Sequence, residues 1–456
     1  MAFRSSNPGE PLGGGPTVAL PEASAINKPD LYIWGIYGVL VVLSIIELYS
    51  ASSFEISKQG LYSPLMRHVG MLFAGFLIIL GLQKVHYSRF IWPGIILTVC
   101  SVLAMLYVMA FGEVINGAKR AISLPFMTLQ PAELIKISAV MTLSFILGTT
   151  QLKKDESVRN KGLIWATIAV LLFSGLLFTQ GLTNTLILMV IFISMIIVGS
   201  LEYRKLQYIF AVFAFFAAMA FGVKMMMSKG EPEVKEIPLL VDSRGRTFSV
   251  PEASGGSNAG SRITDNTWRN RIKAFTDPTP RYEQELNAKN LQEMRSYMAQ
   301  ANGGWLGVFP GNSRETSRLP LAFSDFIFAI IVEDLGFIGA MFIMALYLCL
   351  LARAYFIAYK CYQMYPAFLV TGCALLIALQ ALCHMAIVSG AGPVSGQPLP
   401  FFSKGGTSIL VTSIALGIML SVSKFAARGQ VSTSERETDK NTLPEALQAV
   451  NPTQEK

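Results

Sequence analysis

Charged residues are scarce in this sequence. Aspartate, glutamate, lysine and arginine make up 14% of the 456 residues, whereas hydrophobic residues make up 52%. Ordinary soluble domains contain about 25% charged residues. The mean hydropathy of the chain is +0.48. This composition excludes an ordinary soluble enzyme and predicts a polytopic membrane protein.

Cysteine and histidine are scarce too, and neither forms a recognisable motif. The five cysteines are scattered through or beside apolar segments, with no CxxC spacing. We interpret them as small apolar residues rather than as disulfide partners or metal ligands. The three histidines, at positions 68, 86 and 384, form no HExxH pair. These absences argue against a metal site built from histidine or cysteine.

Residues 1–29 do not have the pattern that is typical of a signal peptide. Residues 1–29 are rich in Gly, Pro and Ser, and no basic start leads into a short apolar core. We therefore predict a disordered cytoplasmic tail at residues 1–29. Residues 427–456 are charged and contain no aromatic residue, which predicts a second disordered cytoplasmic tail. Between the tails, residues 30–426 form one predicted transmembrane domain.

Long apolar runs are abundant. Most approach the roughly 17–25 residues that cross a bilayer as a helix. They lie at residues 31–50, 65–82, 91–111, 129–149, 163–178, 186–201, 206–227, 321–351, 368–389 and 409–422. We expect an all-α, multi-pass membrane protein with about ten transmembrane helices. A large extracytoplasmic loop, residues 228–320, would precede the eighth helix.

The distribution of Lys and Arg predicts the orientation, because these residues gather in short cytoplasmic loops. With the N-terminus inside, every cytoplasmic turn is basic and both termini are cytoplasmic. The basic residues concerned are Lys84, Arg89, Lys153, Lys154, Arg159, Lys161, Arg204, Lys205, Arg353, Lys360, Lys424 and Arg428. The net charge of +8 is then largely a topology signal, which argues against nucleic-acid binding. Residues 112–128, 228–320 and 390–408 share the outer face.

Charged residues in or beside these outer stretches are suited to an anionic substrate. Lys119 and Arg120 would offer positive charge near the outer leaflet. Glu133 and Lys136 lie three residues apart, so they share a helix face and form either a structural pair or part of a site. Lys404 follows a loop too rich in Pro and Gly for a regular helix, and it is a candidate anion contact.

The long outer loop contains two further candidates. The basic-aromatic patch at residues 268–273, which includes Arg271, is either an interfacial helix on lipid headgroups or a cationic wall for an anion. Downstream of Gln292, glycines at 303, 304, 307 and 311 either make turns or let a ligand approach the backbone closely.

Residues 319–336 are the stretch around which the sequence is organised, because the polar loop runs there into an apolar helix. Asp325 lies at the junction, and Glu333 and Asp334 lie about two turns further in. An ionisable side chain inside hydrocarbon costs several kcal/mol unless it is partnered or faces water. These acids are therefore functional candidates, although Asp325 could also simply cap its helix.

Three motifs occur in a fixed order along the chain. They are Gly-Ala-x-Arg…Gln-Pro-x-Glu-x-x-Lys at 117–136, Asn-Gly-Gly…Leu-Pro-x-x-x-Ser-Asp-Phe-Ile-Phe-Ala…Glu-Asp-Leu-Gly at 302–336, and Pro-Val-Ser-Gly-Gln-Pro-Leu-Pro-Phe…Ser-Lys-Gly-Gly-Thr-Ser at 393–408. This arrangement resembles the SEDS (shape, elongation, division, sporulation) family, FtsW and RodA, over about residues 31–426. The last motif is more FtsW-like. Ala121, Ala132 and His384 depart from the family pattern.

The resemblance implies a peptidoglycan glycosyltransferase that polymerises lipid II on the outer face of the bacterial cytoplasmic membrane. It further implies a role in cell division with a class B penicillin-binding protein and other division proteins. Asp325 matches the essential acid of the family, and Arg120, Glu133 and Lys136 match its other motif residues. Our candidate substrate contacts are Arg120, Lys119, Glu133, Lys136, Arg271, Gln292, Ser403 and Lys404.

Chain growth of this kind needs a base for a sugar hydroxyl and positive charge for a leaving diphosphate. We expect Asp325 to supply the first and the basic residues the second. A divalent cation, Mg²⁺ or Mn²⁺, could assist, although no carboxylate cluster dictates one. The alternatives are a RodA-type elongation polymerase, a lipid II flippase or an inactive division scaffold. The outer position of the motifs and the absence of an internal repeat favour an enzyme over a transporter.

Overall fold

The protein is described here by a computed structural model. It describes residues 29–51, 62–115, 118–123, 128–151, 160–199, 207, 212, 239–241, 247–249, 275–276, 290–316, 318–319, 323–361 and 363–441. Several predicted features lie outside these residues. They are residues 1–28 and 442–456 of the tails, Arg271 with most of the 228–289 loop, and all but two residues of the predicted span at 206–227.

Apolar helices make up most of the described residues. Eight helical stretches are long and apolar enough to cross a membrane, and α7 is a shorter apolar helix. The helices are α1 (Leu31–Ala51), α3 (Tyr62–Leu82), α4 (Ile91–Phe111), α5 (Pro131–Thr150), α6 (Asn160–Phe178), α7 (Leu182–Val198), α11 (Ile327–Lys360), α12 (Met364–Val388) and α13 (Gly406–Asn441), with the short 3-10 helix η1 (Tyr87–Phe90) leading into α4. They correspond to nine of the ten predicted runs.

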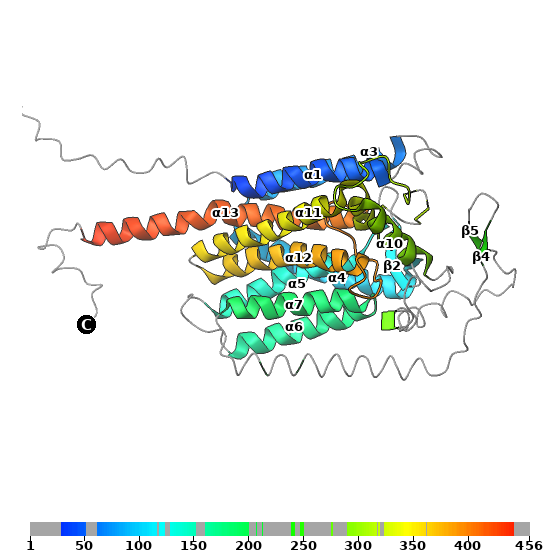
Figure 1. Cartoon of the computed structure of the whole chain (residues 1–456). Coiled ribbons are helices and arrows are strands. Elements are labelled where there is room, and N and C mark those ends of the chain that lie inside the picture. The colour runs from blue at the N-terminus through cyan, green and yellow to red at the C-terminus, as the bar shows by residue number, and fades with distance from the viewer. Residues whose placement is uncertain are drawn as a thin grey trace, which may run out of the picture.

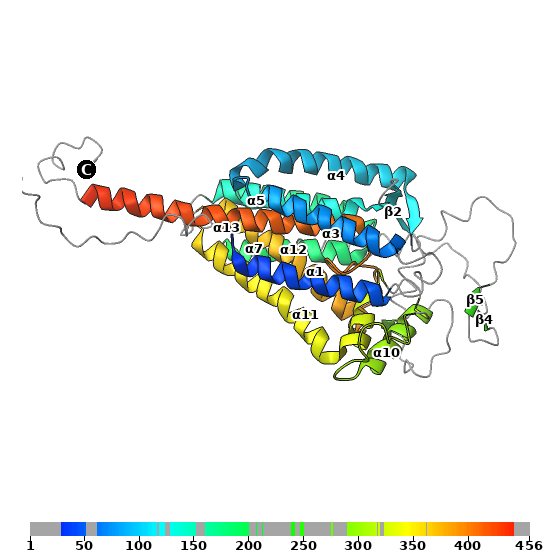
Figure 2. The ribbon, with the colours of Figure 1, turned by 90° about the horizontal axis from the view of Figure 1, so that it is seen from above.

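The helices form one elongated bundle. Figures 1 and 2 show them running side by side, with α10 (Leu291–Gly303) and the strands gathered at one end and α13 extending beyond the other. The centre is formed by α12, which packs against α5, α7, α11 and α13. Most residues of α5 and α12 are buried, whereas α1, α3, α4, α6 and α11 turn many apolar side chains outward. Such surfaces suit contact with lipid.

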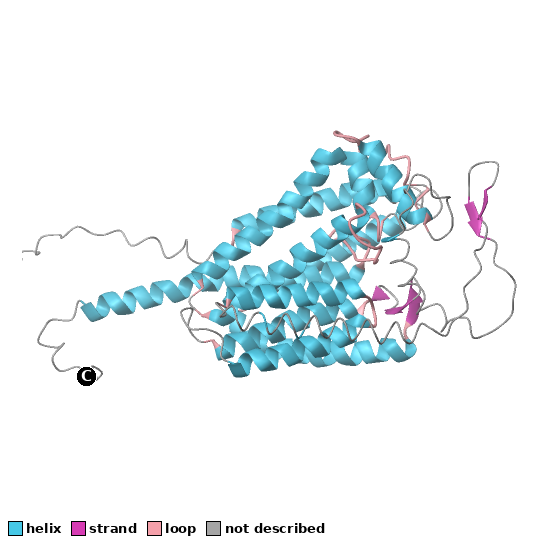
Figure 3. Ribbon diagram, turned by 60° about the horizontal axis from the view of Figure 1, so that its bottom comes forward, coloured by secondary structure: helices cyan, strands magenta, loops and turns pink. Residues whose placement is uncertain are grey.

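Short strands modify the predicted all-α fold. An antiparallel sheet in the order β1-β2-β3 joins β1 (Glu113–Ile115), β2 (Ala118–Ser123) and β3 (Thr128–Leu129), and a separate pair joins β4 (Leu239–Val241) and β5 (Thr247–Ser249). Figure 3 shows these strands beyond one end of the helices. The Asn-Gly pair at 116–117 is the sequence signal for a hairpin, so β1 and β2 could have been predicted.

The eighth predicted span differs from the observed helix. We expected residues 321–351, but α11 begins at Ile327, ends at Lys360 and is interrupted at Gly336, where φ is 70° and ψ is −175°. Glycine adopts this left-handed backbone without the steric cost that a Cβ imposes. The apolar run therefore consists of a short buried helix, residues 327–335, followed by a long helix. Hydropathy alone cannot detect such a break.

The C-terminal tail also differs from the prediction. We expected disorder from residue 427, but α13 continues to Asn441. Once a helix is nucleated, each added residue gains a backbone hydrogen bond. The preceding span can therefore extend into a polar sequence that would not form a helix alone.

Candidate functional site

Asp325 lies in the turn directly before α11. Its side chain is partly exposed, and Ser324 Oγ donates a hydrogen bond to Asp325 Oδ1 at 3.0 Å. The N-cap residue of α11 is Phe326, which makes no side-chain capping bond. Asp325 thus lies one residue before the cap position and is partly exposed. The capping role that the sequence left open for Asp325 stays a prediction, beside its role as a base.

The loop at residues 390–405 docks on the Asp325 turn. Ser403 Oγ donates to the carbonyl of Ser324 at 2.8 Å and accepts from the backbone N–H of Leu399 at 2.7 Å. The backbone N–H of Lys404 donates to the carbonyl of Phe323 at 2.9 Å, and its ammonium lies 4.3 Å from the centroid of the Phe323 ring. Two motifs far apart in sequence therefore meet, as the predicted site requires. Ser403 is buried, and these bonds use its hydroxyl to join the two loops.

Three buried residues, Glu133, Lys136 and Gln380, form a polar cluster that binds the same loop. The Lys136 ammonium donates to Glu133 Oε1 at 2.7 Å and to Gln380 Oε1 at 2.9 Å. Gln380 Nε2 donates to Glu133 Oε2 at 3.4 Å and to the carbonyl of Pro398 at 3.2 Å. The Lys136 side chain is fully buried. Of the two roles left open by the sequence, the structural pair accounts for this geometry, and direct substrate contact by Glu133 and Lys136 stays a prediction.

Further bonds fix the backbone of the loop. The hydroxyl of Tyr347 donates to the carbonyl of Pro400 at 2.6 Å, and Ser44 Oγ donates to the carbonyl of Phe401 at 2.7 Å. His384 Nδ1 lies 2.6 Å from the carbonyl of Gln397, so this nitrogen carries the proton. Helices α1, α11 and α12 therefore all anchor a segment that has no regular secondary structure of its own.

The other predicted contacts are placed less completely. Gln292 lies in the first turn of α10 and is partly buried. Lys119 and Arg120 lie in β2, which pairs with β3 directly before α5, but their side chains are outside the described part of the structure. The patch with Arg271 also lies outside it. The structure thus brings together Asp325, Ser403 and Lys404, and leaves the contribution of these four residues as a prediction.

The described residues contain no group of side chains suited to bind the predicted divalent cation. Among those residues, no three His, Cys, Asp or Glu side chains gather closely enough to hold a metal ion. The carboxylates of Asp325 and Glu133 belong to separate clusters. An assisting Mg²⁺ or Mn²⁺ stays a prediction, and no chemical step is assigned to it.

Sequence reasoning missed Gln380 and Ser324. Gln380 is a polar residue inside an apolar span, and such residues pair with other polar groups in membrane proteins. That signal was present in the sequence. Ser324 makes hydrogen bonds through its backbone carbonyl as well as its hydroxyl. Every residue has a backbone carbonyl, so the sequence cannot indicate such a contact.

Known proteins resemble this chain along most of its length. A FtsW from Trichlorobacter lovleyi, named a probable peptidoglycan glycosyltransferase, is 29% identical over 403 residues, which cover 86% of this chain and 93% of that protein. The Bacillus subtilis protein of the same name is 25% identical and covers 89% and 91%.

Solved structures share the fold. A chain of a peptidoglycan synthase complex, studied for the coordination of polymerization and crosslinking, matches with a TM-score of 0.61, 21% identity and coverage of 87% of this chain and 98% of that one. Thermus thermophilus RodA, a rod shape determining protein, matches with a TM-score of 0.57, 20% identity and coverage of 87% and 97%.

A family model settles the relationship. The model for FtsW, RodA and SpoVE, described as cell cycle proteins, matches residues 30–428. Together with the apolar helices, this match makes the chain a multi-pass membrane protein. The SEDS resemblance read from the three motifs is confirmed. This chain belongs to the FtsW/RodA/SpoVE family of cell cycle proteins.

Proposed function

We propose that this chain is a peptidoglycan glycosyltransferase that polymerises lipid II at the outer face of the bacterial cytoplasmic membrane. The observation that carries the proposal is the docking of the loop at residues 390–405, here called the Lys404 loop, on the Asp325 turn. This docking brings a cation and a partly exposed aspartate to one end of the bundle. The names of its relatives support the same activity.

The geometry suits glycosyl transfer from a diphosphate. A sugar hydroxyl of one lipid-linked saccharide attacks the anomeric carbon of another, and the bond from that carbon to the diphosphate oxygen breaks. Asp325 takes the hydroxyl proton, which requires the carboxylate to lie within hydrogen-bond reach of the hydroxyl. The diphosphate leaves with the bonding electrons, and Lys404 stabilises its negative charge. Arg120, Lys119, Arg271 and Gln292 are the further substrate contacts of this proposal.

Glu133 and Lys136 support the site indirectly in this mechanism. Their charges neutralise each other, and Gln380 transmits the position of the pair to the carbonyl of Pro398. A fully buried ammonium with two acceptors has little capacity left for a diphosphate. The pair therefore helps to fix the position of the Lys404 loop relative to α5 and α12, through the bond from Gln380 to Pro398.

The partner and the orientation belong to the proposal as well. We assign both termini to the cytoplasm and a class B penicillin-binding protein to the role of partner, in cell division. The FtsW names of the relatives support division, and the polymerization and crosslinking activities of the matched synthase complex support a crosslinking partner. A RodA-type elongation polymerase is the alternative within the family.

The test is conversion of labelled lipid II into glycan strands by the purified chain, alone and with its candidate partner, in proteoliposomes. Ladders of strands that disappear when the chain is omitted support the proposal. If the chain makes no strands under either condition but moves lipid II between leaflets, the polymerase is contradicted and a flippase takes its place.

A further inference from the structure

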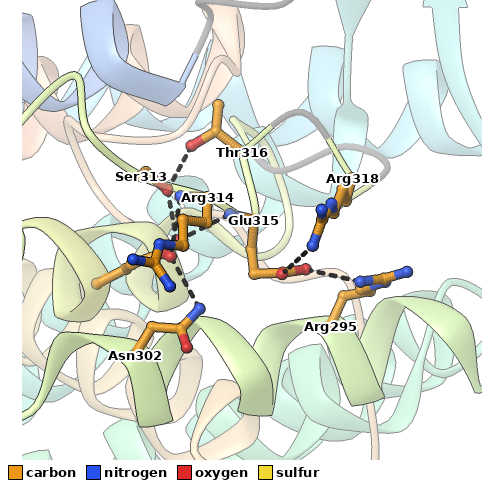
Figure 4. A network of polar contacts seen from close by, with 8 residues as sticks. Arg295, Asn302, Ser313, Arg314, Glu315, Thr316 and Arg318 are labelled. Carbon is orange, nitrogen blue, oxygen red and sulfur yellow. Dashed lines mark hydrogen bonds and ion pairs between the residues drawn. The ribbon is translucent and has the colours of Figure 1, made fainter. Parts of the chain in front are cut away.

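Glu333 is a buried acid that the mechanism above does not use. Its carboxylate accepts hydrogen bonds from Asn302 Nδ2 at 3.1 Å, from the backbone N–H of Arg314 at 3.0 Å and from the backbone N–H of Glu315 at 3.3 Å. It also accepts from Ser313 Oγ. One side chain of α11 thus binds four donors of the segment at residues 302–316. Figure 4 shows Asn302, Ser313 and Arg314 of this segment close to one another.

The network continues from this segment to α10. Glu315 is buried and pairs with Arg295 of α10 at 3.2 Å and with Arg318 at 3.4 Å. Thr316 Oγ1 donates to Ser313 Oγ at 2.7 Å. Figure 4 shows Arg295 and Arg318 converging on Glu315. Glu333 and Glu315 therefore join α10, the 302–316 segment and α11 into one unit.

The backbone of the segment follows the break in α11. The N–H groups of Val308 and Phe309 donate to the carbonyls of Glu333 and Asp334 at 2.9 Å each, and Phe337 N donates to the carbonyl of Gly304 at 2.9 Å. The break would otherwise leave helix carbonyls unsatisfied, and the segment supplies their partners. The segment is therefore docked closely, and Glu333 lies at the centre of the docking.

A carboxylate fits this position for a chemical reason. An ionised carboxylate only accepts hydrogen bonds, and all four of its partners here are donors. A glutamine would have nearly the same shape, but its NH₂ group would face N–H and O–H donors. The burial of Glu333 makes each lost acceptor costly, because water cannot replace it. What this position requires is therefore the ability of the side chain to accept hydrogen bonds, and not only its size.

We infer that Glu333 is a positioning residue for the glycosyl transfer, which holds α10 and the 302–316 segment against α11 and thereby fixes the placement of Gln292 and Asp325. The inference rests on the proposed function. Asp325 directly precedes the short helix at residues 327–335, and Glu333 lies near the end of that helix. The segment that docks on Glu333 therefore contacts the same short helix that begins at the Asp325 turn. Displacement of that turn by a fraction of an ångström moves the carboxylate away from the acceptor hydroxyl.

The decisive comparison is Glu333→Gln against Asp334→Asn. Asp334 is the adjacent residue and is equally buried, but its carboxyl oxygens accept no hydrogen bond from the 302–316 segment. We expect Glu333→Gln to lower kcat about tenfold or more, since misplaced catalytic groups cost up to about a hundredfold. KM for lipid II should change less than about threefold, whereas Asp334→Asn should stay within about twofold of wild type in both constants.

A second pair of variants avoids the core and guards against misfolding. Asn302→Ala removes one donor to Glu333 at an exposed position, whereas Asn312→Ala removes a bond to the Val308 carbonyl within the segment. We expect kcat to fall about two- to fivefold in the first variant and to stay unchanged in the second. Neither change should alter the thermal unfolding midpoint by a measurable amount.

Hydrogen exchange provides a readout that does not need activity. The amides of Arg314 and Glu315 should exchange at least about tenfold faster in Glu333→Gln and at the wild-type rate in Asp334→Asn. Equal kcat in wild type and Glu333→Gln, or equal losses in both variants, would overturn the inference. A wild-type protein that makes no glycan strands, with the exchange difference still present, would instead contradict the proposed function.

Discussion

The backbone N–H of Lys404 donates a hydrogen bond to the carbonyl of Phe323 at 2.9 Å, and the ammonium of the same lysine lies 4.3 Å from the centroid of the Phe323 ring. This relationship fixes a cation two residues from Asp325. A cation–π contact holds the ammonium through the attraction between the positive charge and the face of the ring. Because the Phe323 ring has no formal charge, this contact does not cancel the charge of Lys404.

The charge of Lys404 should matter for the diphosphate. Lys404→Gln keeps the backbone bond to Phe323 and removes the positive charge. We expect kcat/KM for lipid II to fall about 10- to 100-fold, because hydrogen bonds to charged groups contribute about 1.5–3 kcal/mol. Lys404→Arg should retain most of the activity. Steady-state kinetics of strand formation measure both, and equal values for wild type and Lys404→Gln would remove this residue from the site.

The buried cluster of Glu133, Lys136 and Gln380 should lose more stability from a single substitution than from a double one. Lys136→Met leaves Glu133 buried without its ion-pair partner, so the free energy of unfolding should fall by about 3–5 kcal/mol. The double variant Lys136→Met with Glu133→Gln should recover a large part of that loss. Thermal unfolding in detergent at fixed pH measures the difference. Equal unfolding midpoints for the single and double variants would show that the pair carries no mutual stabilisation.

Gly336 should not tolerate alanine. An added Cβ would lie 2.4 Å from both the N atom of Gly307 and the carbonyl oxygen of Trp305, at a φ of 70°. The left-handed backbone alone costs an alanine about 1–2 kcal/mol, so the unfolding midpoint should fall. Gly38→Ala is the matched control, because no heavy atom lies within 4 Å of its added Cβ. That variant should be unchanged or slightly more stable.

The orientation can be tested by labelling. Asn312 and Lys360 are both exposed and lie in opposite loops of the predicted topology. In a variant without the five native cysteines, Asn312→Cys should react with a membrane-impermeant maleimide in intact cells. Lys360→Cys should react only after the membrane is opened. Labelling of Lys360→Cys in intact cells would reverse the orientation and place the candidate site in the cytoplasm.

The sequence predicted the helices well, because hydrophobic length is a direct consequence of bilayer thickness. It also predicted the meeting of the Asp325 and Lys404 motifs, through the family resemblance. It did not predict the break at Gly336, because the apolar run continues through the break. A glycine inside a predicted helix does not by itself indicate a break, since glycine also occurs within regular helices. Glu333 was identified as an acid that needs a partner, but two of its four donors are backbone amides, which have no sequence signature.

The roles within the site were harder to predict than its members. Ser403 contacts the Asp325 turn, and Glu133 and Lys136 contact Gln380. All three side chains bind protein groups rather than an open surface. Residue type shows that a polar group must be satisfied in an apolar span. It does not show whether a ligand or another helix satisfies it. Only the packing of α5 against α12 decides that question for Lys136.

The most direct test of the account is strand formation by Asp325→Asn, compared with wild type and with Asp30→Asn at equal folded amounts. Asp30 pairs with Arg353 through a 2.6 Å contact at the start of α1 and takes no part in the proposed chemistry. The account predicts that Asp325→Asn lowers the rate by about 10²–10⁴-fold, the range for loss of a general base, with lipid II binding retained. A rate for Asp325→Asn within a few-fold of wild type would contradict it.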